Sequence, residues 1–362
     1  MTTSRDAAWM DRALVLAERG RGRTSPNPIV GAVIVSPAGV VVGQGAHLEA
    51  GGPHAEVHAL DMAGERARGA TIYCTLEPCS HTGRTGPCAA RVVRAGIRRA
   101  VVATADPNPI VSGAGLAHLR EHGIDVTEGV GRERARRQNA PFFTWVTRRR
   151  PFVILKAALS RDGFVGRAGE QVRLTGPEAD RFLHRQRAEI DAIAVGAGTV
   201  QSDDPWLTPR GAYRHRPLTR VIFDWRVRVS AAARVFSTLD AGPVIMVVGR
   251  DAAEERRAGL EDLAARGVII ERVAARDIAG VLGRLAGREI LSLLVEGGPL
   301  LQAAFYRAGV VDRVQWVITP RQVGDGVPLD LDVGRDFLWE LPPRVTRLGD
   351  DMLVECDVHG TD

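Results

Sequence analysis

Lysine is almost absent from this chain. Its 48 basic residues comprise 47 arginines and one lysine, Lys156. Arginine can replace lysine on a protein surface, but not where a compact ammonium group or a proton donor is needed. Lys156 also lies within an apolar run, residues 152–159, where a solvated lysine is unexpected. We therefore expect Lys156 to have a functional role.

Cysteine and long apolar runs are also scarce. Four cysteines in 362 residues do not make a disulfide framework, and we expect Cys74 and Cys356, in strand-like segments, to be buried and inert. No run of about 18 apolar residues occurs, which excludes a membrane-spanning helix. The N-terminus lacks the apolar core of a signal peptide. We therefore expect a cytoplasmic protein without a membrane partner.

Composition and charge indicate an ordinary globular protein. Apolar residues make up 45% and charged residues 25% of the chain, and its length favours two domains over one. The net charge is +5, but the two tight basic clusters, residues 21–23 and 148–150, contain no aromatic residues for stacking on single strands. We therefore expect no nucleic-acid partner, whereas a phosphorylated small substrate suits this charge balance.

One short segment carries the pattern of a zinc-dependent base deaminase. His54 can supply a nitrogen ligand and Cys79 and Cys88 two thiolates, which leaves the fourth tetrahedral position open for water. Zinc lowers the pKa of bound water to near neutrality. Glu56, two residues after His54, would carry a proton to the leaving amine. The segment therefore predicts a catalytic Zn²⁺ site.

Other classes of protein remain open at this point. A structural zinc site normally has four protein ligands, and His58 or His81 could be the fourth. A zinc-stabilised scaffold without catalysis would carry the same residues. A deaminase that acts on nucleic acid would share the zinc centre, but it would need a basic groove with stacking residues and would leave the second half of the chain unexplained.

Alternating strand and helix patterns predict two α/β domains. In the first half we expect strands at 29–35, 40–43, 71–76 and 99–105 and helices at 6–19, 54–66 and 89–95. In the second half we expect strands at 152–159, 192–195, 220–224, 243–248, 267–270 and 291–295 and helices at 177–188 and 300–308. The basic cluster before Pro151 marks a linker, so the expected domains are 1–147 and 148–362.

Several stretches resemble the bifunctional riboflavin-biosynthesis pyrimidine deaminase/reductase family over the whole chain. They are residues 24–31, 53–60, 75–81, 83–88 and 106–109 in the first half, and 156–163, 198–205, 207–210 and 295–299 in the second. Eight residues separate Cys79 from Cys88, a spacing typical of this family. The resemblance implies a cytidine-deaminase-like αβα sandwich followed by a dihydrofolate-reductase-like α/β domain.

The resemblance also implies roles for individual residues. In the first domain His54, Cys79 and Cys88 would hold Zn²⁺ and Glu56 would shuttle the proton, with Asn27 and the loop 81–84 lining the pyrimidine and phosphate pocket. In the second, Lys156 would lie beside the carbonyl to be reduced, and its ammonium, or Glu296 through water, would supply the proton. The residues expected to bind NADPH are Ala158, Thr199, Asp203 and Gly298. Those expected to bind the substrate are Arg187, Leu207, Arg210 and Glu296.

Three positions depart from the family pattern, all in the second half. Gln171 and Arg173 stand where the family usually has serine and tryptophan, and Trp225 stands where a small residue is usual. Gln171 can still hydrogen-bond the substrate, and Arg173 could pair with a cofactor phosphate. A deaminase with an altered or lost reductase activity is therefore the alternative to a bifunctional enzyme.

The resemblance implies two consecutive reactions in riboflavin biosynthesis. The first is the zinc-dependent hydrolytic deamination of 2,5-diamino-6-(5-phosphoribosylamino)pyrimidin-4-one. The second is the NADPH-dependent reduction of the ribosyl group of 5-amino-6-(5-phosphoribosylamino)uracil to ribityl. We also expect the enzyme to be a homo-oligomer.

Overall fold

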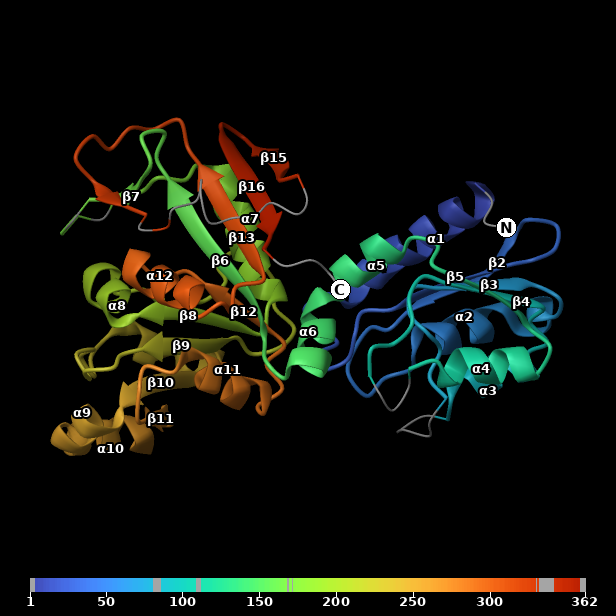
Figure 1. Cartoon of the computed structure of the whole chain (residues 1–362), viewed down its shortest axis with the longest axis horizontal. Coiled ribbons are helices and arrows are strands. Elements are labelled where there is room, and N and C mark those ends of the chain that lie inside the picture. Colours follow the sequence, from blue (N-terminus) through green and yellow to red (C-terminus); the bar gives the residue numbers. More distant parts are fainter. Residues whose placement is uncertain are drawn as a thin grey trace. The chain divides into compact units, whose positions relative to one another are not determined.

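The computed structural model describes residues 4–80, 86–108, 112–167, 169–170, 172–329, 331 and 342–358. These divide into two compact units, which meet in the chain between Arg149 and Arg150 (Figure 1). Each unit has its own sheet and its own hydrophobic core. In the described residues, no helix is long and apolar enough to cross a membrane.

The first unit contains a five-stranded sheet in the order β2-β1-β3-β4-β5. Its strands are β1 (Gly31–Val35), β2 (Val41–Ala46), β3 (Thr71–Cys74), β4 (Arg99–Val102) and β5 (Asp125–Glu128). Strand β1 pairs antiparallel with β2 and β3, whereas β3, β4 and β5 run parallel. Every residue of β1 is buried, as expected for a central strand covered on both faces.

Helices cover both faces of this sheet. They are α1 (Ser4–Ala17), α2 (Ala55–Ala63), α3 (Cys88–Arg94), α4 (Ala114–Glu121), α5 (Arg132–Gln138) and α6 (Ala140–Arg148). Helices α1 and α5 lie over one face, where Met10 and Leu14 pack with Val33 and Val101. Helices α2, α3 and α4 lie over the other face (Figure 1). The first unit is therefore a three-layer αβα sandwich.

Two glycines of β2 allow α2 to lie directly on the sheet. A Cβ atom at Gly43 would stand 2.1 Å from the carbonyl oxygen of Ala59, and one at Gly45 would stand 2.5 Å from that of Ala55. Contacts this short leave no room for a side chain at either position unless α2 moves away from the sheet. The close approach fixes the N-terminus of α2 against the sheet edge, and this is the end of the helix that carries His54.

The second unit contains a nine-stranded sheet in the order β11-β10-β9-β8-β12-β6-β13-β16-β15. Its strands are β6 (Phe152–Leu159), β8 (Ala192–Gly196), β9 (Thr219–Phe223), β10 (Val244–Gly249), β11 (Ile269–Val273), β12 (Ser292–Val295), β13 (Arg313–Ile318), β15 (Arg344–Leu348) and β16 (Asp351–Asp357). The sheet is parallel from β11 to β13, and β16 and β15 extend it antiparallel. Strands β7 (Phe164–Gly166) and β14 (Val327–Pro328) form a separate pair.

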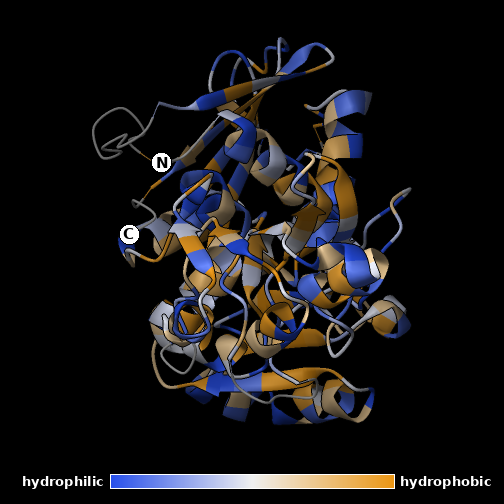
Figure 2. Ribbon diagram, turned by 90° about the vertical axis from the view of Figure 1, so that its right-hand side faces the viewer, coloured by the Kyte–Doolittle hydropathy of each residue, from blue (hydrophilic) through white to orange (hydrophobic). Residues whose placement is uncertain are grey.

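The helices of the second unit mostly follow the parallel strands. They are α7 (Pro177–Glu189), α8 (Ala197–Asp203), α9 (Arg250–Glu255), α10 (Arg257–Ala265), α11 (Ile278–Ala286) and α12 (Pro299–Arg307). A 3₁₀ segment spans Arg234–Ala241. Helices of this chain carry hydrophobic and hydrophilic residues side by side (Figure 2), as expected for helices that cover a sheet. Strands β8 and β12 are neighbours in the middle of the sheet. The turns that follow them therefore lie side by side at the C-terminal ends of the parallel strands.

Candidate active sites

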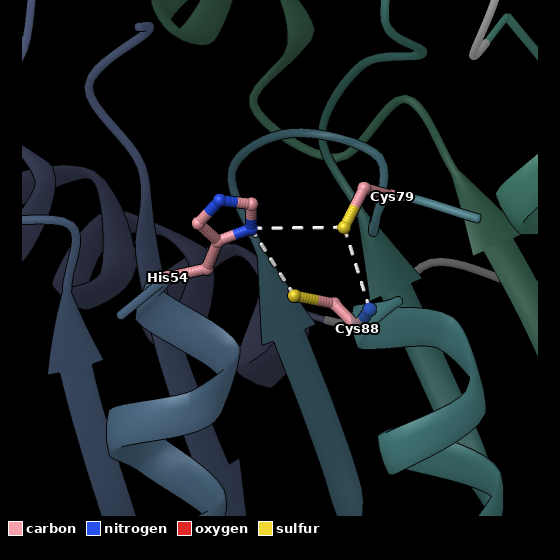
Figure 3. A group of neighbouring side chains, drawn as sticks. All are labelled: His54, Cys79 and Cys88. Carbon is pink, nitrogen blue, oxygen red and sulfur yellow. Dashed lines mark hydrogen bonds between the residues drawn. The ribbon is translucent and has the colours of Figure 1, made fainter. Parts of the chain in front are cut away.

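Three metal-binding side chains meet at the N-terminal ends of α2 and α3 (Figure 3). His54 immediately precedes α2, Cys88 is the first residue of α3, and Cys79 lies in the loop after β3. The Nδ1 atom of His54 is 3.6 Å from Cys79 Sγ and 3.2 Å from Cys88 Sγ. A tetrahedral zinc ion separates such ligand atoms by roughly 3.5 Å. The donor set and its spacing therefore fit Zn²⁺.

The cluster has three members among the described residues. Its three donor atoms lie within 4.8 Å of one another, and neither His58 nor Glu56 belongs to it. His81, the other residue considered as a fourth ligand, lies in the segment 81–85 outside the described residues. Three protein ligands leave one tetrahedral position for water, which is the arrangement of catalytic zinc.

The two cysteines differ in their affinity for a proton. The neighbouring Cys88 thiol and His54 lower the pKa of Cys79, and the backbone N–H of Cys88 donates to Cys79 Sγ at 3.3 Å. The same pairing with Cys79, together with burial, raises the pKa of Cys88. Two adjacent thiolates are thus unfavourable by themselves. A divalent cation between them removes this conflict, because a coordinated thiol is deprotonated.

Glu56 lies in the first turn of α2 beside these ligands. Its side chain is 3% exposed, and burial raises its pKa to about 7, although His54 acts to lower it. Glu56 lines a cavity of about 210 Å³ together with His54 and Cys79. A carboxyl group in this position can accept a proton from one partner and return it to another.

Asn27 lines the same cavity and is held by a histidine that sequence analysis did not identify. The Nδ2 atom of Asn27 is 3.1 Å from His47 Nε2, and His47 Nδ1 is 3.0 Å from the carbonyl oxygen of Pro53. Because that carbonyl can only accept, Nδ1 carries the proton and Nε2 accepts from Asn27. Burial lowers the pKa of His47, which favours this neutral form. His47 therefore orients the Asn27 amide.

Glu77 connects the loop of Cys79 to the segment around Asp106, and both segments line the cavity. Its buried carboxylate accepts hydrogen bonds from the backbone N–H groups of Asp106, Gly113 and Gly115 at 3.2, 3.0 and 2.8 Å. Gly115 lies in the first turn of α4, where a carboxylate is favoured by the helix dipole. Glu77 thereby fixes the segment around Asp106 beside the metal cluster.

In the second unit, Lys156 belongs to a buried cluster of charges. Arg187 donates to Glu296 through two bonds, Nε to Oε1 at 2.9 Å and Nη2 to Oε2 at 2.6 Å. Lys156 Nζ lies 3.9 Å from Glu296 Oε2. Burial lowers the pKa of Lys156. Burial acts to raise the pKa of Glu296, but Arg187 and Lys156 lower it to about 2, so Glu296 stays ionised.

Gln302 of α12 connects Lys156 to the glycine turn after β12. Its Nε2 atom donates to the carbonyl oxygens of Lys156 and Gly297 at 3.1 and 2.8 Å, and only 3% of the residue is exposed. Strand β12 pairs with β6 only as far as Leu155. Gln302 therefore supplies a hydrogen-bond donor on the β12 side of Lys156, where the strand pairing has ended.

Three cavities of the second unit hold most of the remaining predicted residues. The lysine cavity, of about 640 Å³, is lined among others by Lys156, Arg173, Arg187 and Arg210. The loop cavity, of about 440 Å³, is lined among others by Arg173, Arg187, Asp203, Leu207 and Arg210. The glycine cavity, of about 1030 Å³, is lined among others by Thr199, Gly298 and Trp225. His184, which no sequence pattern indicates, also lines the lysine cavity.

The glycine cavity has two features that are typical of dinucleotide sites. Gly298 precedes α12 and donates its N–H to Thr199 Oγ1 at 3.1 Å. The N-terminus of a helix after a glycine turn attracts phosphate groups, and crevices at the carboxyl ends of parallel strands are the usual place for such ligands. Asp203, also expected at the cofactor, lies in the same helix as Thr199 and lines the loop cavity.

Two further residues predicted to contact the cofactor, Ala158 and Arg173, lie away from the glycine cavity. Ala158 pairs with Val317 within the sheet and lines none of the three cavities. Arg173 pairs with Asp180 at 2.5 Å and lies at the lysine and loop cavities rather than at the glycine cavity. Gln171 lies outside the described residues.

Comparison with protein families identifies both units. Residues 3–104 match the cytidine and deoxycytidylate deaminase zinc-binding region, and residues 151–350 match the RibD C-terminal domain. The riboflavin biosynthesis protein RibD of Aquifex aeolicus is 41% identical over 353 residues, which cover 96% of this chain and 97% of that protein. RibD of Escherichia coli is 39% identical over 332 residues, which cover 88% of this chain and 89% of that protein.

Solved structures show the same two-domain fold. RibD of Acinetobacter baumannii superposes with a TM-score of 0.85 at 33% identity, covering 98% of this chain and 99% of that one. A diaminohydroxyphosphoribosylaminopyrimidine deaminase/5-amino-6-(5-phosphoribosylamino)uracil reductase of Thermotoga maritima gives 0.86 at 34% identity, covering 98% and 99%. The expected fold class is thereby confirmed. The chain belongs to the RibD family of riboflavin-biosynthesis enzymes, which combine a zinc-dependent deaminase with an NADPH-dependent reductase.

Proposed function

We propose that this enzyme catalyses two consecutive steps on phosphorylated pyrimidines. The first is the hydrolytic deamination of 2,5-diamino-6-(5-phosphoribosylamino)pyrimidin-4-one. The second reduces the ribosyl group of 5-amino-6-(5-phosphoribosylamino)uracil to ribityl with NADPH. The observation that carries the proposal is the cluster of His54, Cys79 and Cys88 beside the buried Glu56, in a chain that also holds the Lys156–Glu296–Arg187 cluster.

In the deaminase site, each residue has a distinct task. His54, Cys79 and Cys88 hold Zn²⁺, which supplies a Lewis acid that activates water. Glu56 takes a proton at its carboxylate and passes it to the leaving amine. Asn27, oriented by His47, binds the pyrimidine in the cavity of about 210 Å³. That volume admits the base, so we place the ribosyl phosphate at the mouth of the cavity.

In the reductase site, Lys156 supplies the proton that accompanies hydride transfer from NADPH. Its Nζ atom is a better donor than Glu296, because Glu296 is ionised and engaged by Arg187 through two hydrogen bonds. Arg187 and Arg210 line both the lysine and loop cavities and are suited to bind the substrate phosphate. Leu207, at the loop cavity, and Gln171 complete the proposed substrate contacts.

The proposed cofactor site is formed by the turns that follow β8 and β12. Thr199 and Gly298 line the glycine cavity and hold the cofactor phosphates. Ala158, Arg173 and Asp203 lie outside this cavity, and we propose them as contacts to other parts of the cofactor. The NADPH-dependent chemistry itself belongs to the cofactor, and the chain supplies position and charge.

We assign deamination to residues 1–147 and reduction to residues 148–362. The family matches at 3–104 and 151–350 support this division. We further propose that the enzyme is a cytoplasmic homo-oligomer that acts on small molecules, with no nucleic-acid or membrane partner. Measurement of its mass in solution tests the oligomeric part of this proposal.

Mass spectrometry of the products tests the two activities. Zinc-loaded enzyme is incubated with the diaminopyrimidinone ribosyl phosphate, with and without NADPH. We expect the aminouracil without NADPH and its ribityl form with NADPH. Deamination that stops at the aminouracil even with NADPH would support the deaminase-only alternative, and no turnover at all would contradict the proposal.

Two variants separate the sites in the same assay. Glu56→Gln is expected to abolish deamination while reduction of added aminouracil continues. Lys156→Met is expected to lower the rate of reduction by about 100- to 10,000-fold, as for removal of a general acid. Deamination should continue at the wild-type rate. Equal loss of both activities in either variant would contradict the assignment.

A further inference from the structure

The loop that connects α8 to β9, residues 204–218, is held in place by side chains. Among the described residues, no backbone–backbone hydrogen bond involves residues 205–214. Within this loop Leu207 is buried and has a φ of 57°, a left-handed conformation that is unfavourable for leucine. Such a conformation persists only where the surrounding structure holds it. The contacts that attach the loop to its neighbours therefore determine its shape.

Helix α7 attaches this loop at two points. The backbone N–H of Arg210 donates to Nδ1 of His184 at 3.2 Å. The guanidinium group of Arg214 donates to the carbonyl oxygens of Ala188 and Ile190 at 3.0 and 2.7 Å. These carbonyl groups lie at the C-terminal end of α7, where a helix leaves its acceptors without an internal partner. The loop is therefore docked on α7 by one contact within the helix and one at its end.

The same helix carries the second arginine that we assign to the substrate phosphate. Arg187 lies three residues after His184 on α7, and residues at this spacing share one face of a helix. Arg187 and Arg210 line the same two cavities. Because Arg187 belongs to the helix and Arg210 to the loop, the contact at His184 sets the spacing between the two arginines.

His184 can make this contact only when Nδ1 carries no proton. A backbone N–H donates and does not accept, so Nδ1 must be the acceptor and the ring must be neutral. Burial, together with the positive charges of Arg187 and Arg210, lowers the pKa of His184, which favours the neutral ring. Charged groups of both signs share its cavity or act on its charge: Lys156, Arg173, Arg187 and Arg210, and Asp180 and Glu296.

We propose that His184 is a positioning residue for substrate binding, an inference that rests on the proposed reductase function. Its neutral ring holds the backbone at Arg210, so that Arg187 and Arg210 meet the substrate phosphate at a fixed spacing. Protonation of His184 would place one N–H group against another and release the loop from α7. The affinity for the ribosyl phosphate then falls, whereas proton donation by Lys156 continues.

Two substitutions of His184 test the proposal in the full-length zinc-loaded enzyme. His184→Leu removes the acceptor, and leucine is a good helix former, so α7 should persist. His184→Asn keeps an acceptor, because Oδ1 of asparagine is attached at the same carbon position as Nδ1 of histidine. Near neutral pH, we expect His184→Leu to raise the KM for the aminouracil by about 3- to 10-fold. The kcat and the KM for NADPH should stay at their wild-type values, and His184→Asn should restore the KM.

The pH dependence of the same KM separates a positioning role from a structural one. In the wild type the KM should be constant where His184 is neutral and should rise as the pH falls through its pKa, which lies below the usual histidine value of about 6.5. The substrate phosphate also takes up a proton near pH ~6 and raises the KM in every variant. His184→Asn keeps only this second contribution, so its KM should rise less steeply than that of the wild type.

His215→Leu is the matched control. His215 is exposed on the same loop and lines neither the lysine cavity nor the loop cavity. We expect wild-type kinetics and a wild-type pH profile in this variant. A loss of kcat without a change in KM in His184→Leu would overturn the proposal. So would an unrestored KM in His184→Asn, or identical pH profiles of His184→Asn and the wild type.

Direct binding of the aminouracil keeps this inference apart from the proposed function. The ligand is titrated calorimetrically into each variant without NADPH. Weaker binding in His184→Leu but not in His184→Asn supports the role of His184, even if the wild type reduces nothing and the reductase assignment fails. An enzyme that reduces the aminouracil and binds it equally well in all variants keeps its function and contradicts the role of His184.

Discussion

At Lys156, burial and ion pairing act in opposite directions. Burial lowers the pKa of its ammonium, while Glu296 raises it. Glu296 is 3.9 Å away and already shared with Arg187, so its charge compensates Lys156 only in part. The result is an ammonium group that releases its proton more readily than that of a solvated lysine. At the scale of single residues, this explains why arginine, which stays charged, could not stand here.

The pH dependence of the reductase tests this view of Lys156. A general acid must be protonated, so reduction should persist below the pKa of Lys156 and fall as the pH rises through it. Because that pKa is lowered, the alkaline limb should lie below the usual lysine value of about 10.4. The measurement is kcat/KM for NADPH oxidation against pH, with deamination followed in parallel as the control.

Lys156→Arg sharpens the same experiment. Any activity that remains should lose this alkaline limb, since arginine does not release its proton in this range. A wild-type profile without a limb below about 10.4, or a limb that persists in Lys156→Arg, would show that another group titrates.

The site residues that can be recognised in the sequence have a characteristic spacing or are rare in composition, whereas the others have neither property. His54, Glu56, Cys79 and Cys88 have a characteristic spacing, and Lys156 is recognisable because it is the sole lysine. His47, Glu77, His184 and Gln302 have no such signal. They act through partners far away in the sequence, as His47 does with Asn27 across 20 positions and Gln302 with Lys156 across 146. Only the fold brings these pairs together.

At the scale of elements, each site depends on how a helix sits on its sheet. In the deaminase unit, Gly43 and Gly45 allow α2 to approach β2, and this sets the position of His54. In the reductase unit, Gln302 ties α12 to both β6 and the glycine turn. The chemistry of each site therefore responds to changes at positions that touch no ligand.

Gly43→Ala should disturb the zinc site through α2. The added methyl group would meet the carbonyl oxygen of Ala59, at 2.1 Å in the unperturbed structure, and must displace the helix. We expect a loss of about 1–3 kcal/mol in the free energy of unfolding and weaker zinc binding. Denaturant unfolding and a competitive zinc titration measure the two effects.

Gly259→Ala is the control for this substitution. Gly259 lies in α10, and a Cβ atom there would meet no other atom within 4 Å. Alanine should leave the stability unchanged or raise it by up to about 1 kcal/mol, with zinc binding unaffected. The account of α2 fails if Gly43→Ala behaves like Gly259→Ala.

Gln302→Met removes the link between α12 and Lys156 while keeping the side-chain volume. The carbonyl groups of Lys156 and Gly297 would each lose a donor, at a cost of about 1–3 kcal/mol for buried groups left unpaired. We expect a fall of about 10-fold in the kcat of reduction, with the shape of the pH profile altered and deamination unchanged.

Gln302→Glu distinguishes the lost donor from the lost volume. It keeps the shape of the side chain but brings an acceptor against two carbonyl oxygens, so reduction should fall at least as far as in Gln302→Met. Reductase kinetics and NADPH affinity are measured for both variants. Normal kcat in Gln302→Glu would show that the amide donor does not position Lys156.

The sequence predicts strands with a continuous apolar run better than strands in which polar residues interrupt the run. The apolar runs of β1, β10 and β12 are recognisable because every residue of these strands except Gly249 is buried. Strand β5 reads Asp-Val-Thr-Glu and β15 reads Arg-Val-Thr-Arg-Leu, and both lie at a sheet edge. Edge strands need no continuous apolar run, so these two gave no signal in sequence. Their pairing partners are defined only in the folded sheet.

At the scale of the whole molecule, the chain combines two cores with two different cofactor requirements. The metal cluster belongs to the first unit, and the three cavities around Lys156 and Gly298 belong to the second. The expected α/β class of both units is confirmed. The two activities should therefore be separable by removing one cofactor at a time.

Removal of zinc should abolish deamination and leave reduction intact. A chelator withdraws the ion that His54, Cys79 and Cys88 would hold, but the cores of both units contain no metal ligand other than Cys88 among the described residues. We expect the loss of deamination, a lower melting temperature of the first unit, and unchanged reduction of added aminouracil. Activity assays, circular dichroism and calorimetry measure these effects.

Restored zinc provides the control, since deamination should return on its addition. Unfolding of the first unit on chelation would favour structural zinc. Deamination that continues after complete removal of the metal would contradict a zinc-dependent mechanism.

The most direct test of a single chain with two activities is one isotopic labelling experiment. The enzyme converts the diaminopyrimidinone ribosyl phosphate in ¹⁸O-labelled water with NADPH deuterated at the transferred position, and the product is fragmented by mass spectrometry. The account predicts one ¹⁸O atom in the new carbonyl group of the pyrimidine and one deuterium on the sugar chain of the same molecule. A product that carries the ¹⁸O label without deuterium, or no labelled product, would contradict it.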